Sequence, residues 1–495
     1  MADNTKIWPI FRWANGGLSD DLFTGIRNSF YYSNDMEIRE DAKSIFPKPV
    51  PAYADANTWI AVWTASNNYI FNVTKTTHDW WLVCLGKKIY SVNTSTETVT
   101  LVCTFADYIC DLEIFNWYIY ISTRQYVYYK VDNWSHWSDM ESATDDSVLN
   151  YWRCTIQLKN NANHPLYASD VCLCVWDCSR MYKITREVPN VLQLWFEIQA
   201  EYYIRFINEL GWFVRATAVD APYWSEVLLW DKVSSAPTEV IPLEWYTALG
   251  SAIYWWYHYL LSDKWLWLIN WYQYYILKKA EWDVQTTIRN CMCVYDDKLY
   301  FVANDWVYIY WAKNKNYADV LALWHKVEDW FSLGAISAYS EGIMITRNWR
   351  SGSGWSAALV WENYWLATTW EVQTMCYFGT SMSEIKQAMY LRVGYHLPKE
   401  WNNSWNIHIY YRTEADATSD SPDDWSWHEV TKPWGLYVDW DMRSPFATTL
   451  KLNCRFQWIQ FKFVTTNCVY DDNWTTKTKD TNLYSADLYY NDMLD

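Results

Sequence analysis

Glycine is in short supply in this sequence. Only 13 of the 495 residues are glycine, although about 7% is usual in proteins. Tryptophan is in excess, with 39 copies of a residue that is normally among the rarest. Together the two types make up about a tenth of the chain, a plausible glycine content for a turn-rich β protein. The shortage and the excess therefore call for one explanation.

Clustered basic residues are also missing. The formal net charge is −17, and nucleic-acid binding requires Lys and Arg gathered on one surface. Residues 1–17 contain no apolar run long enough for a signal peptide. The most apolar stretch, 251–277, is interrupted by His258 and Asp263 and alternates like strands, so a membrane span is rejected. We therefore expect neither nucleic-acid binding nor membrane insertion.

No recognisable catalytic or metal-binding motif is present. The 12 cysteines lack the spacing of a zinc site and are expected to be buried free thiols. Phosphate-binding loops, HExxH and Gly-x-Ser-x-Gly are absent. Acidic pairs such as Asp296–Asp297 have the chemistry of a glycosidase or a weak calcium site, but they fall in predicted turns, where Asp caps the backbone. We expect no enzyme activity, no catalytic residue, no cofactor and no metal.

Many tryptophans follow Asn or Asp. In these dipeptides a hairpin turn favours glycine, because type I′ turns have positive φ at both central residues. Our hypothesis is that UGA codons, which some bacterial lineages and their viruses read as glycine, have been translated here as tryptophan. Trp230 and Trp427 are expected to be genuine tryptophans. The positions suspected to be natively glycine are Trp80, Trp117, Trp134, Trp271, Trp306, Trp349, Trp425 and Trp458.

The alternative is that the aromatic residues are real and form a sugar-binding surface. The best cluster for contacting a glycan is Trp255, Trp256, Tyr257 and Tyr259. If the two tryptophans are glycine natively, the same segment becomes a glycine-rich strand start. The glycan hypothesis therefore depends on the identity of these residues.

Alternating apolar and polar residues predict an all-β fold. Seven hairpin-like units begin near residues 79, 116, 169, 210, 263, 296 and 339, at intervals typical of four-stranded propeller blades. We expect a β-propeller of six to eight blades, with seven favoured, over residues 53–373. Each blade covers its faces only against its neighbours, so the ring must close.

Longer alternating segments predict a β-sandwich over residues 374–468. The segment 448–464 changes phase at Trp458, which we interpret as a β-bulge within one strand. Residues 1–52 lack strand periodicity and are expected to form an extended arm. Residues 469–495 are polar and are expected to form a tail.

With glycine imagined at the turn tryptophans, several segments resemble virion structural proteins of tailed bacteriophages that combine a β-propeller with a β-sandwich. The segment 13–25 resembles their opening segment, and 229–237 resembles their Trp-Asp-Gly blade turn. The stretches 305–310 and 409–413 are also similar. The likeness spans about residues 10–465, although the family does not share the tryptophan content.

This resemblance implies a non-enzymatic component of a phage tail or tail tip, made in the host cytoplasm and located in the virion. It implies a multi-copy assembly with other tail proteins, in which the ring is a scaffold and the sandwich docks or contacts the host surface, through a glycan or a protein. The alternative function is a carbohydrate-binding or glycan-degrading propeller protein.

Overall fold

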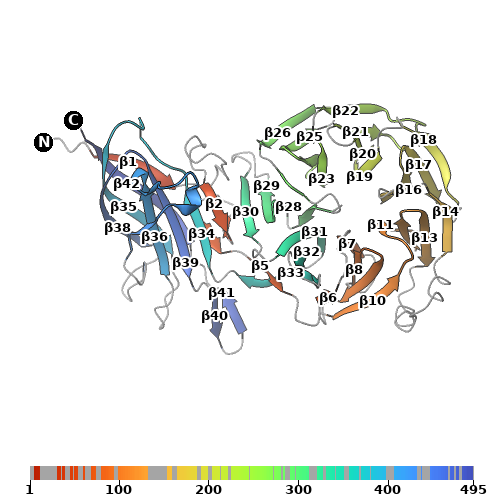
Figure 1. Ribbon diagram of the computed structural model, residues 1–495, viewed down its shortest axis with the longest axis horizontal. Coiled ribbons are helices and arrows are strands. Elements are labelled where there is room, and N and C mark those ends of the chain that lie inside the picture. Colours follow the sequence, from red (N-terminus) through yellow and green to blue (C-terminus); the bar gives the residue numbers. More distant parts are fainter. Residues whose placement is uncertain are drawn as a thin grey trace. The chain divides into compact units, whose positions relative to one another are not determined.

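The computed structural model is built almost entirely of β-strands (Figure 1). Where the structure describes the chain, it contains no α-helix, only two 3₁₀ turns, η5 (Glu414–Asp416) and η6 (Pro422–Asp424). The described residues are 5–11, 30–34, 36–38, 45–47, 49–53, 59–61, 68–73, 80–93, 98–116, 118–131, 153–158, 164–186, 191–198, 203–211, 213–220, 224–244, 246–270, 273–279, 282–284, 290–295, 297–311, 320–326, 331–339, 342–349, 356–366, 369–379, 381–396, 406–431, 436, 446–466, 469–472, 475–478 and 482–493.

The predicted all-β class is confirmed, and most strands lie in small antiparallel sheets. Strands follow each other within a sheet because successive apolar segments are separated by short turns. The first four such sheets along the chain contain β7 (Asn68–Val73), β8 (Trp80–Leu85), β9 (Lys88–Asn93) and β10 (Thr98–Thr104); β11 (Ile109–Phe115), β12 (Tyr118–Thr123), β13 (Tyr126–Val131) and β14 (Arg153–Gln157); β15 (Leu166–Ala168), β16 (Cys172–Asp177), β17 (Arg180–Thr185) and β18 (Gln193–Glu197); and β19 (Tyr203–Leu210), β20 (Phe213–Asp220), β21 (Trp224–Trp230) and β22 (Glu239–Glu244).

Three further small sheets follow along the chain. The third of them is extended by two strands from the N-terminal part of the chain, which pair with the last of its own strands. These sheets contain β23 (Ala248–Tyr254), β24 (Tyr257–Ser262), β25 (Trp265–Asn270) and β26 (Gln273–Lys279); β27 (Met292–Tyr295), β28 (Lys298–Ala303), β29 (Trp306–Trp311) and β30 (Val320–Lys326); and β31 (Phe331–Tyr339), β32 (Gly342–Trp349), β33 (Ser356–Leu366), β5 (Pro49–Tyr53) and β6 (Trp59–Ala61).

The chain divides into two compact units. One comprises residues 53–305 and 327–361, and the other comprises 1–52, 306–326 and 362–495. Within the first unit, the opening strands of the small sheets contact one another in succession, from β7 through β11, β15, β19, β23, β27 and β31 back to β7. Figure 1 shows the labelled members of this series, β7, β11, β19, β23 and β31, around a common centre, with later strands such as β14, β22 and β26 farther out.

Apolar side chains between neighbouring sheets form the core of the first unit. One cluster joins Leu173 and Val175 of β16 to Tyr120 of β12 and Val127 of β13. Another joins Leu229 of β21 to Leu260 of β24 and other residues of both sheets. In both clusters one sheet thus covers an apolar face of the next sheet.

The last strands of six small sheets contain either a register shift or a proline. In β10, β14, β18, β26 and β30 the register with the preceding strand shifts by one residue. β22 pairs without a shift and instead contains Pro242. Bulges and proline both discourage pairing with a further strand. Each of these outer edges therefore contains a bulge or a proline that hinders pairing with a further strand.

The second unit contains two larger sheets. The six-stranded sheet has β1 (Lys6–Phe11), β3 (Met36–Ile38), β4 (Ile45–Pro47), β35 (Lys386–His396), β38 (Phe446–Phe456) and β42 (Asn482–Asp492). The five-stranded sheet has β2 (Phe30–Asn34), β34 (Trp370–Thr374), β36 (Asn406–Thr413), β37 (His428–Glu429) and β39 (Ile459–Thr466). A separate hairpin consists of β40 (Val469–Asp472) and β41 (Thr475–Thr478).

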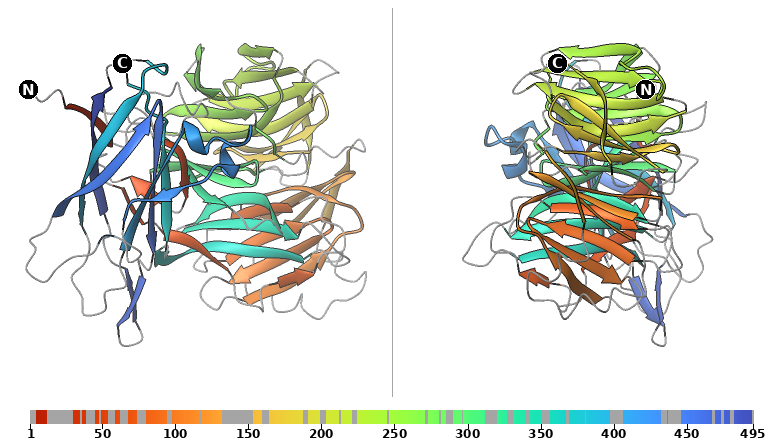
Figure 2. Two further views of the ribbon diagram at one scale, coloured as in Figure 1. Left: turned by 60° about the vertical axis from the view of Figure 1, so that its left-hand side comes forward. Right: turned by 90° about the vertical axis from the view of Figure 1, so that its right-hand side faces the viewer.

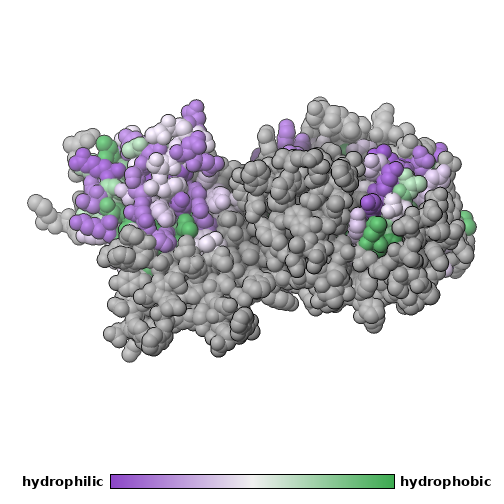
Figure 3. Space-filling view, turned by 60° about the horizontal axis from the view of Figure 1, so that its bottom comes forward, coloured by the Kyte–Doolittle hydropathy of each residue, from purple (hydrophilic) through white to green (hydrophobic). Residues whose placement is uncertain are grey.

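Aromatic contacts join these two sheets. Tyr377, which bridges to Ile459 of β39, stacks on Trp8 of β1 at 3.7 Å. Its hydroxyl lies 2.7 Å from the hydroxyl of Tyr490 in β42. Figure 2 shows the strands of this unit from two sides. In Figure 3 the described atoms over these sheets are mostly hydrophilic with separate apolar spots, as expected when the apolar residues face inward.

Both chain ends differ from the expected arm and tail. β42 lies between β4 and β35 and pairs with β35 from Asn482 to Asp492. β1 in turn pairs with β42, and β2 pairs with β34. β42 was not predicted because the residues before 482 are polar. Its Leu483, Ala486 and Leu488 are fully buried.

The predicted bulge at Trp458 is wrong. β38 ends at Phe456 and β39 begins at Ile459, and the two strands belong to different sheets. The change of phase marks a connection between sheets, through Gln457 and Trp458. The register shift within β38 lies a few residues earlier, where Asn453 has φ 57°.

A close approach in the first unit explains one of the remaining glycines. A Cβ atom added to Gly250 in β23 would lie 2.2 Å from Cys291 Sγ and 2.9 Å from Met292 Cγ. The Cys291 thiol is itself held by a hydrogen bond to the Leu249 carbonyl, at 3.3 Å. The neighbouring sheets can therefore meet here only if residue 250 has no side chain.

We expect Gly250→Ala to lower the free energy of unfolding by about 1–3 kcal/mol, because overpacking a rigid contact forces side chains and backbone to move. Urea unfolding of the purified variant measures the loss. Combining the change with Cys291→Ala removes the clashing Sγ atom and should restore part of the loss. Equal stability of Gly250→Ala and the parent protein would contradict the packing described here.

Candidate functional site

The predicted glycan-contact cluster lies at the tip of a hairpin. Tyr254 at the end of β23 pairs with Tyr257 at the start of β24, so Trp255 and Trp256 are the two turn residues. Their φ angles are 53° and 71°. Their side chains are 56% and 77% exposed, and that of Tyr257 is 37% exposed. The tip thus presents three aromatic side chains to solvent.

The fourth predicted member, Tyr259, is not part of this surface. It is completely buried, and its ring lies 5.6 Å from that of Tyr254. Alternation along β24 puts residues 257 and 259 on one face, but the strand passes from the exposed tip into the core between these positions. Tyr259 therefore cannot contact a ligand in this conformation.

The suspected glycine positions occupy several kinds of place. Trp117, Trp134 and Trp271 lie outside the described residues. Trp80 and Trp306 each begin a strand, and Trp349 ends one. Beside Trp306, positive φ falls on the two preceding turn residues, Asn304 and Asp305. None of the five described positions has a positive φ angle, so the backbone does not require glycine at them.

Two of these tryptophans pack against other side chains. The Trp425 and Trp458 rings lie 5.3 Å apart, and Trp458 is 8% exposed. The Trp425 indole N–H donates to the Ser419 carbonyl at 2.7 Å, and the Arg412 guanidinium lies 4.9 Å from its ring centre. These contacts give both indoles a structural role in the second unit.

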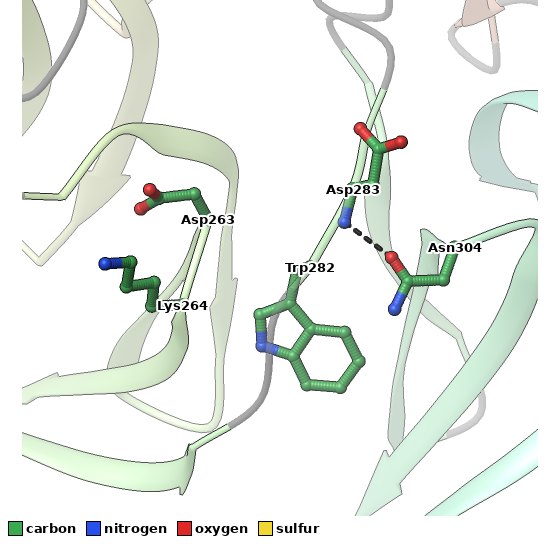
Figure 4. Close-up of a pocket in the computed structure, with 5 residues that line it drawn as sticks. All are labelled: Asp263, Lys264, Trp282, Asp283 and Asn304. Carbon is green, nitrogen blue, oxygen red and sulfur yellow. Dashed lines mark hydrogen bonds between the residues drawn. The ribbon is translucent and has the colours of Figure 1, made fainter.

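An open pocket of about 450 Å³ lies in the first unit (Figure 4). It is lined by Asp263, Lys264, Trp282, Asp283 and Asn304. Two of its polar side chains accept hydrogen bonds from backbone N–H groups. Asp263 Oδ1 accepts from the Thr247 N–H at 3.0 Å, and Asn304 Oδ1 accepts from the Asp283 N–H at 2.5 Å.

The aromatic residue of this pocket is part of the core. Trp282 is 5% exposed, and its ring meets that of Phe301 edge to face at 5.4 Å. A sugar-binding site needs an accessible aromatic face for stacking, which this buried indole does not provide. The pocket is therefore a weak candidate for glycan binding.

A Ser–His pair is present but unsuited to catalysis. Ser251 Oγ lies 2.7 Å from His258 Nε2 and donates a hydrogen bond to Asn208 Oδ1. Burial, with a smaller effect of Arg215, lowers the pKa of His258 to about 3. A general base works best when its pKa lies near the working pH. The pair is therefore a structural link between β19, β23 and β24.

His258 should make the protein sensitive to acid. Its ordinary pKa is 6.5, so above that pH the ring is neutral in both states and its contribution to stability is complete. As the pH falls from 6.5 towards 3, the unfolded chain binds a proton that the folded chain does not, which costs about 1.4 kcal/mol per pH unit. We expect His258→Gln to remove this part of the acid sensitivity, as measured by urea unfolding at neutral and mildly acidic pH. Parallel pH profiles for parent and variant would contradict it.

Sequence analysis missed the role of His164. Its ring nitrogens lie 2.9 Å from the Trp176 carbonyl and 3.1 Å from the Arg124 carbonyl, and its own carbonyl accepts from Ser122 Oγ at 2.5 Å. The residue is completely buried and joins two neighbouring sheets. No local pattern marks it, because the partners of its ring are backbone carbonyls, at Arg124 and at Trp176 of β16.

The described cysteines are free, and most are buried. Within the described ranges, no group of three or more His, Cys, Asp or Glu side chains is arranged to hold a metal ion. Asp423 and Asp424 lie in η6, Asp471 and Asp472 end β40, and Asp297 is a turn residue with φ 55°. In the part of the chain that is described, no helix is long and apolar enough to span a membrane.

Comparisons with known proteins add little. No family model matches the chain, and no curated protein matches it. Among solved structures, it is similar to a chain of one described as "Crystal Structure of Mitotic Checkpoint Complex", at 10% identity and a TM-score of 0.44, covering 64% of this chain and 92% of that chain. A similarity of this size supports no conclusion about function.

Proposed function

We propose that this chain is a non-enzymatic structural protein of a bacteriophage tail or tail tip, with a seven-bladed β-propeller and a β-sandwich. The observation that carries the proposal is the succession of contacts among seven opening strands that returns from β31 to β7. Six four-stranded sheets and one five-stranded sheet, β31–β33 with β5 and β6, are consistent with the predicted repeat. The paired sheets of the second unit supply the sandwich.

The blade turn named in the resemblance supports this proposal. The Trp230 indole N–H donates to the Ser234 carbonyl at 2.7 Å, and Asp231 Oδ1 accepts from the Ser234 N–H at 2.7 Å. Lys232, at the position where the phage proteins have glycine, has φ 65°. The turn therefore has the conformation that the phage motif's glycine would favour.

In this proposal the propeller is a rigid scaffold and the sandwich docks on other tail proteins or contacts the host surface, in several copies per virion. Mass spectrometry of purified particles from a phage that carries this gene tests the assignment. We expect peptides from both units at several copies per particle. Their absence from particles that remain infectious would refute the assignment.

A second candidate is a carbohydrate-binding protein, favoured by the exposed aromatic tip at Trp255 and Trp256. A glycan array and a depolymerase assay on the purified protein distinguish this function from the first. If the protein is a structural tail component, we expect no glycan binding that depends on Trp255 and Trp256. Binding that is lost in the Trp255→Ala/Trp256→Ala variant would establish the second candidate.

A further inference from the structure

The turn between β23 and β24 has a backbone that suits glycine. It is a two-residue hairpin in which both central residues, Trp255 and Trp256, have positive φ, at 53° and 71°. This is the type I′ arrangement, whose twist matches that of the flanking strands and which favours Asn, Asp and Gly. A residue with a Cβ atom is strained there, most of all one with a bulky side chain.

Equivalent turns in the same unit provide an internal comparison. Between β28 and β29 the two central residues are Asn304 and Asp305, with φ 52° and 60°. Positive φ is also found at Asn116 between β11 and β12, at Gly211 between β19 and β20, and at Asp297 between β27 and β28. These turns use residues that tolerate the conformation, whereas the β16–β17 turn has a smaller side chain, that of Cys178, at φ 59°. Tryptophan at both central positions sets the β23–β24 turn apart.

The two indoles gain little from packing to offset this strain. Their side chains are 56% and 77% exposed, and the ring of Trp255 meets that of Tyr254 edge to face at 6.4 Å. By contrast, Trp176, Trp267 and Trp370 are at most 2% exposed. The chain thus contains tryptophans that build the core and a pair that occupies a strained, solvent-exposed turn.

We infer that residues 255 and 256 are glycine in the protein that the native organism makes, their codons being read there as glycine rather than tryptophan. The hypothesis that some tryptophans are natively glycine then extends to Trp255 and Trp256, which the sequence analysis gave as candidate glycan contacts. The native protein would then lack both exposed indoles at this tip, which would offer no tryptophan for sugar stacking. This inference does not depend on the proposed tail function.

Three purified variants test the strain argument. We expect Trp255→Gly/Trp256→Gly to raise the Tm by about 4 °C, because the backbone strain is relieved and little burial is lost. Trp255→Ala/Trp256→Ala removes the same indoles but keeps a Cβ atom, so it should gain no more than about 1 °C. Trp267→Gly, in the core, should lower the Tm by far more than either change.

Equal Tm values for the glycine and alanine variants would contradict the strain argument, since the gain would then come from removing exposed indoles. The decisive second measurement is the mass of the peptide that spans residues 233–264, obtained from the native source. Two glycine-sized residues at 255 and 256 establish the inference. Two tryptophan-sized residues refute it, even if the protein itself proves to be a virion component.

Discussion

Removing residues 482–495 should unfold the second unit. β42 lies between β4 and β35, and β1 pairs along its edge, so its loss leaves the six-stranded sheet divided. Leu483, Leu488 and Tyr490 are buried, and burying a large apolar side chain contributes about 1.5–3 kcal/mol. The loss approaches the whole stability of a typical domain, about 5–15 kcal/mol.

Calorimetry and limited proteolysis of the shortened chain would show this effect. We expect the thermal transition of the second unit to disappear and proteolysis to spread over residues 374–468, while the first unit keeps its own transition. A chain that ends after Met493 retains all of β42 and is the matched control. If removing 482–495 changes neither readout, then β42 is a loose tail after all.

Trp267→Ala should cost about 3–5 kcal/mol of the free energy of unfolding, the usual loss for truncating a large core aromatic. Trp267 in β25 is 2% exposed and packs in a cluster with Leu260 and Ile269. Its indole N–H also donates to Ser262 Oγ at 3.0 Å. The substitution therefore leaves a cavity and removes a hydrogen bond within the core.

Urea unfolding followed by circular dichroism measures this loss. Trp256→Ala is the matched control, since it deletes the same side chain from a position that is 77% exposed and should change stability by less than about 0.5 kcal/mol. A small effect at Trp267 would mean that the core between β21, β24 and β25 is not packed as described.

The sequence predicted the strands better than their grouping into sheets. Each predicted hairpin corresponds to an antiparallel pair, from β8–β9 to β32–β33. Six begin at the second strand of a sheet, but the unit at Asp263 consists of β25 and β26, one strand later. Alternation identifies a strand from its own residues, whereas its sheet is fixed by distant partners. This one shift explains the unequal intervals before and after the unit at 263, but not the long interval between the units at 116 and 169, which both begin at a second strand.

The change of phase at Trp458 illustrates the same limit. A bulge within one strand and a connection between two sheets both insert residues that break the alternation. Only the partners distinguish them: β38 pairs with β35, and β39 pairs with β34 and β36. The C-terminal strand was missed for another reason, because the polar residues before it dominated the local composition.

The Asn-Trp and Asp-Trp dipeptides predicted turns with positive φ, but they did not identify which residues have it. Asp305–Trp306 was selected as an Asp-Trp dipeptide, yet the turn centre is Asn304–Asp305 and Trp306 already belongs to β29. Trp255 and Trp256 follow Tyr254, so no Asn or Asp marked them. The positions of positive φ depend on strand register, which local sequence does not fix.

Cryo-electron microscopy of virions from a phage that carries this gene tests the central claim most directly. The account predicts repeated density in the tail that fits a ring of seven small antiparallel sheets and a two-sheet unit. A complete map of infectious particles in which no density fits either unit would contradict it.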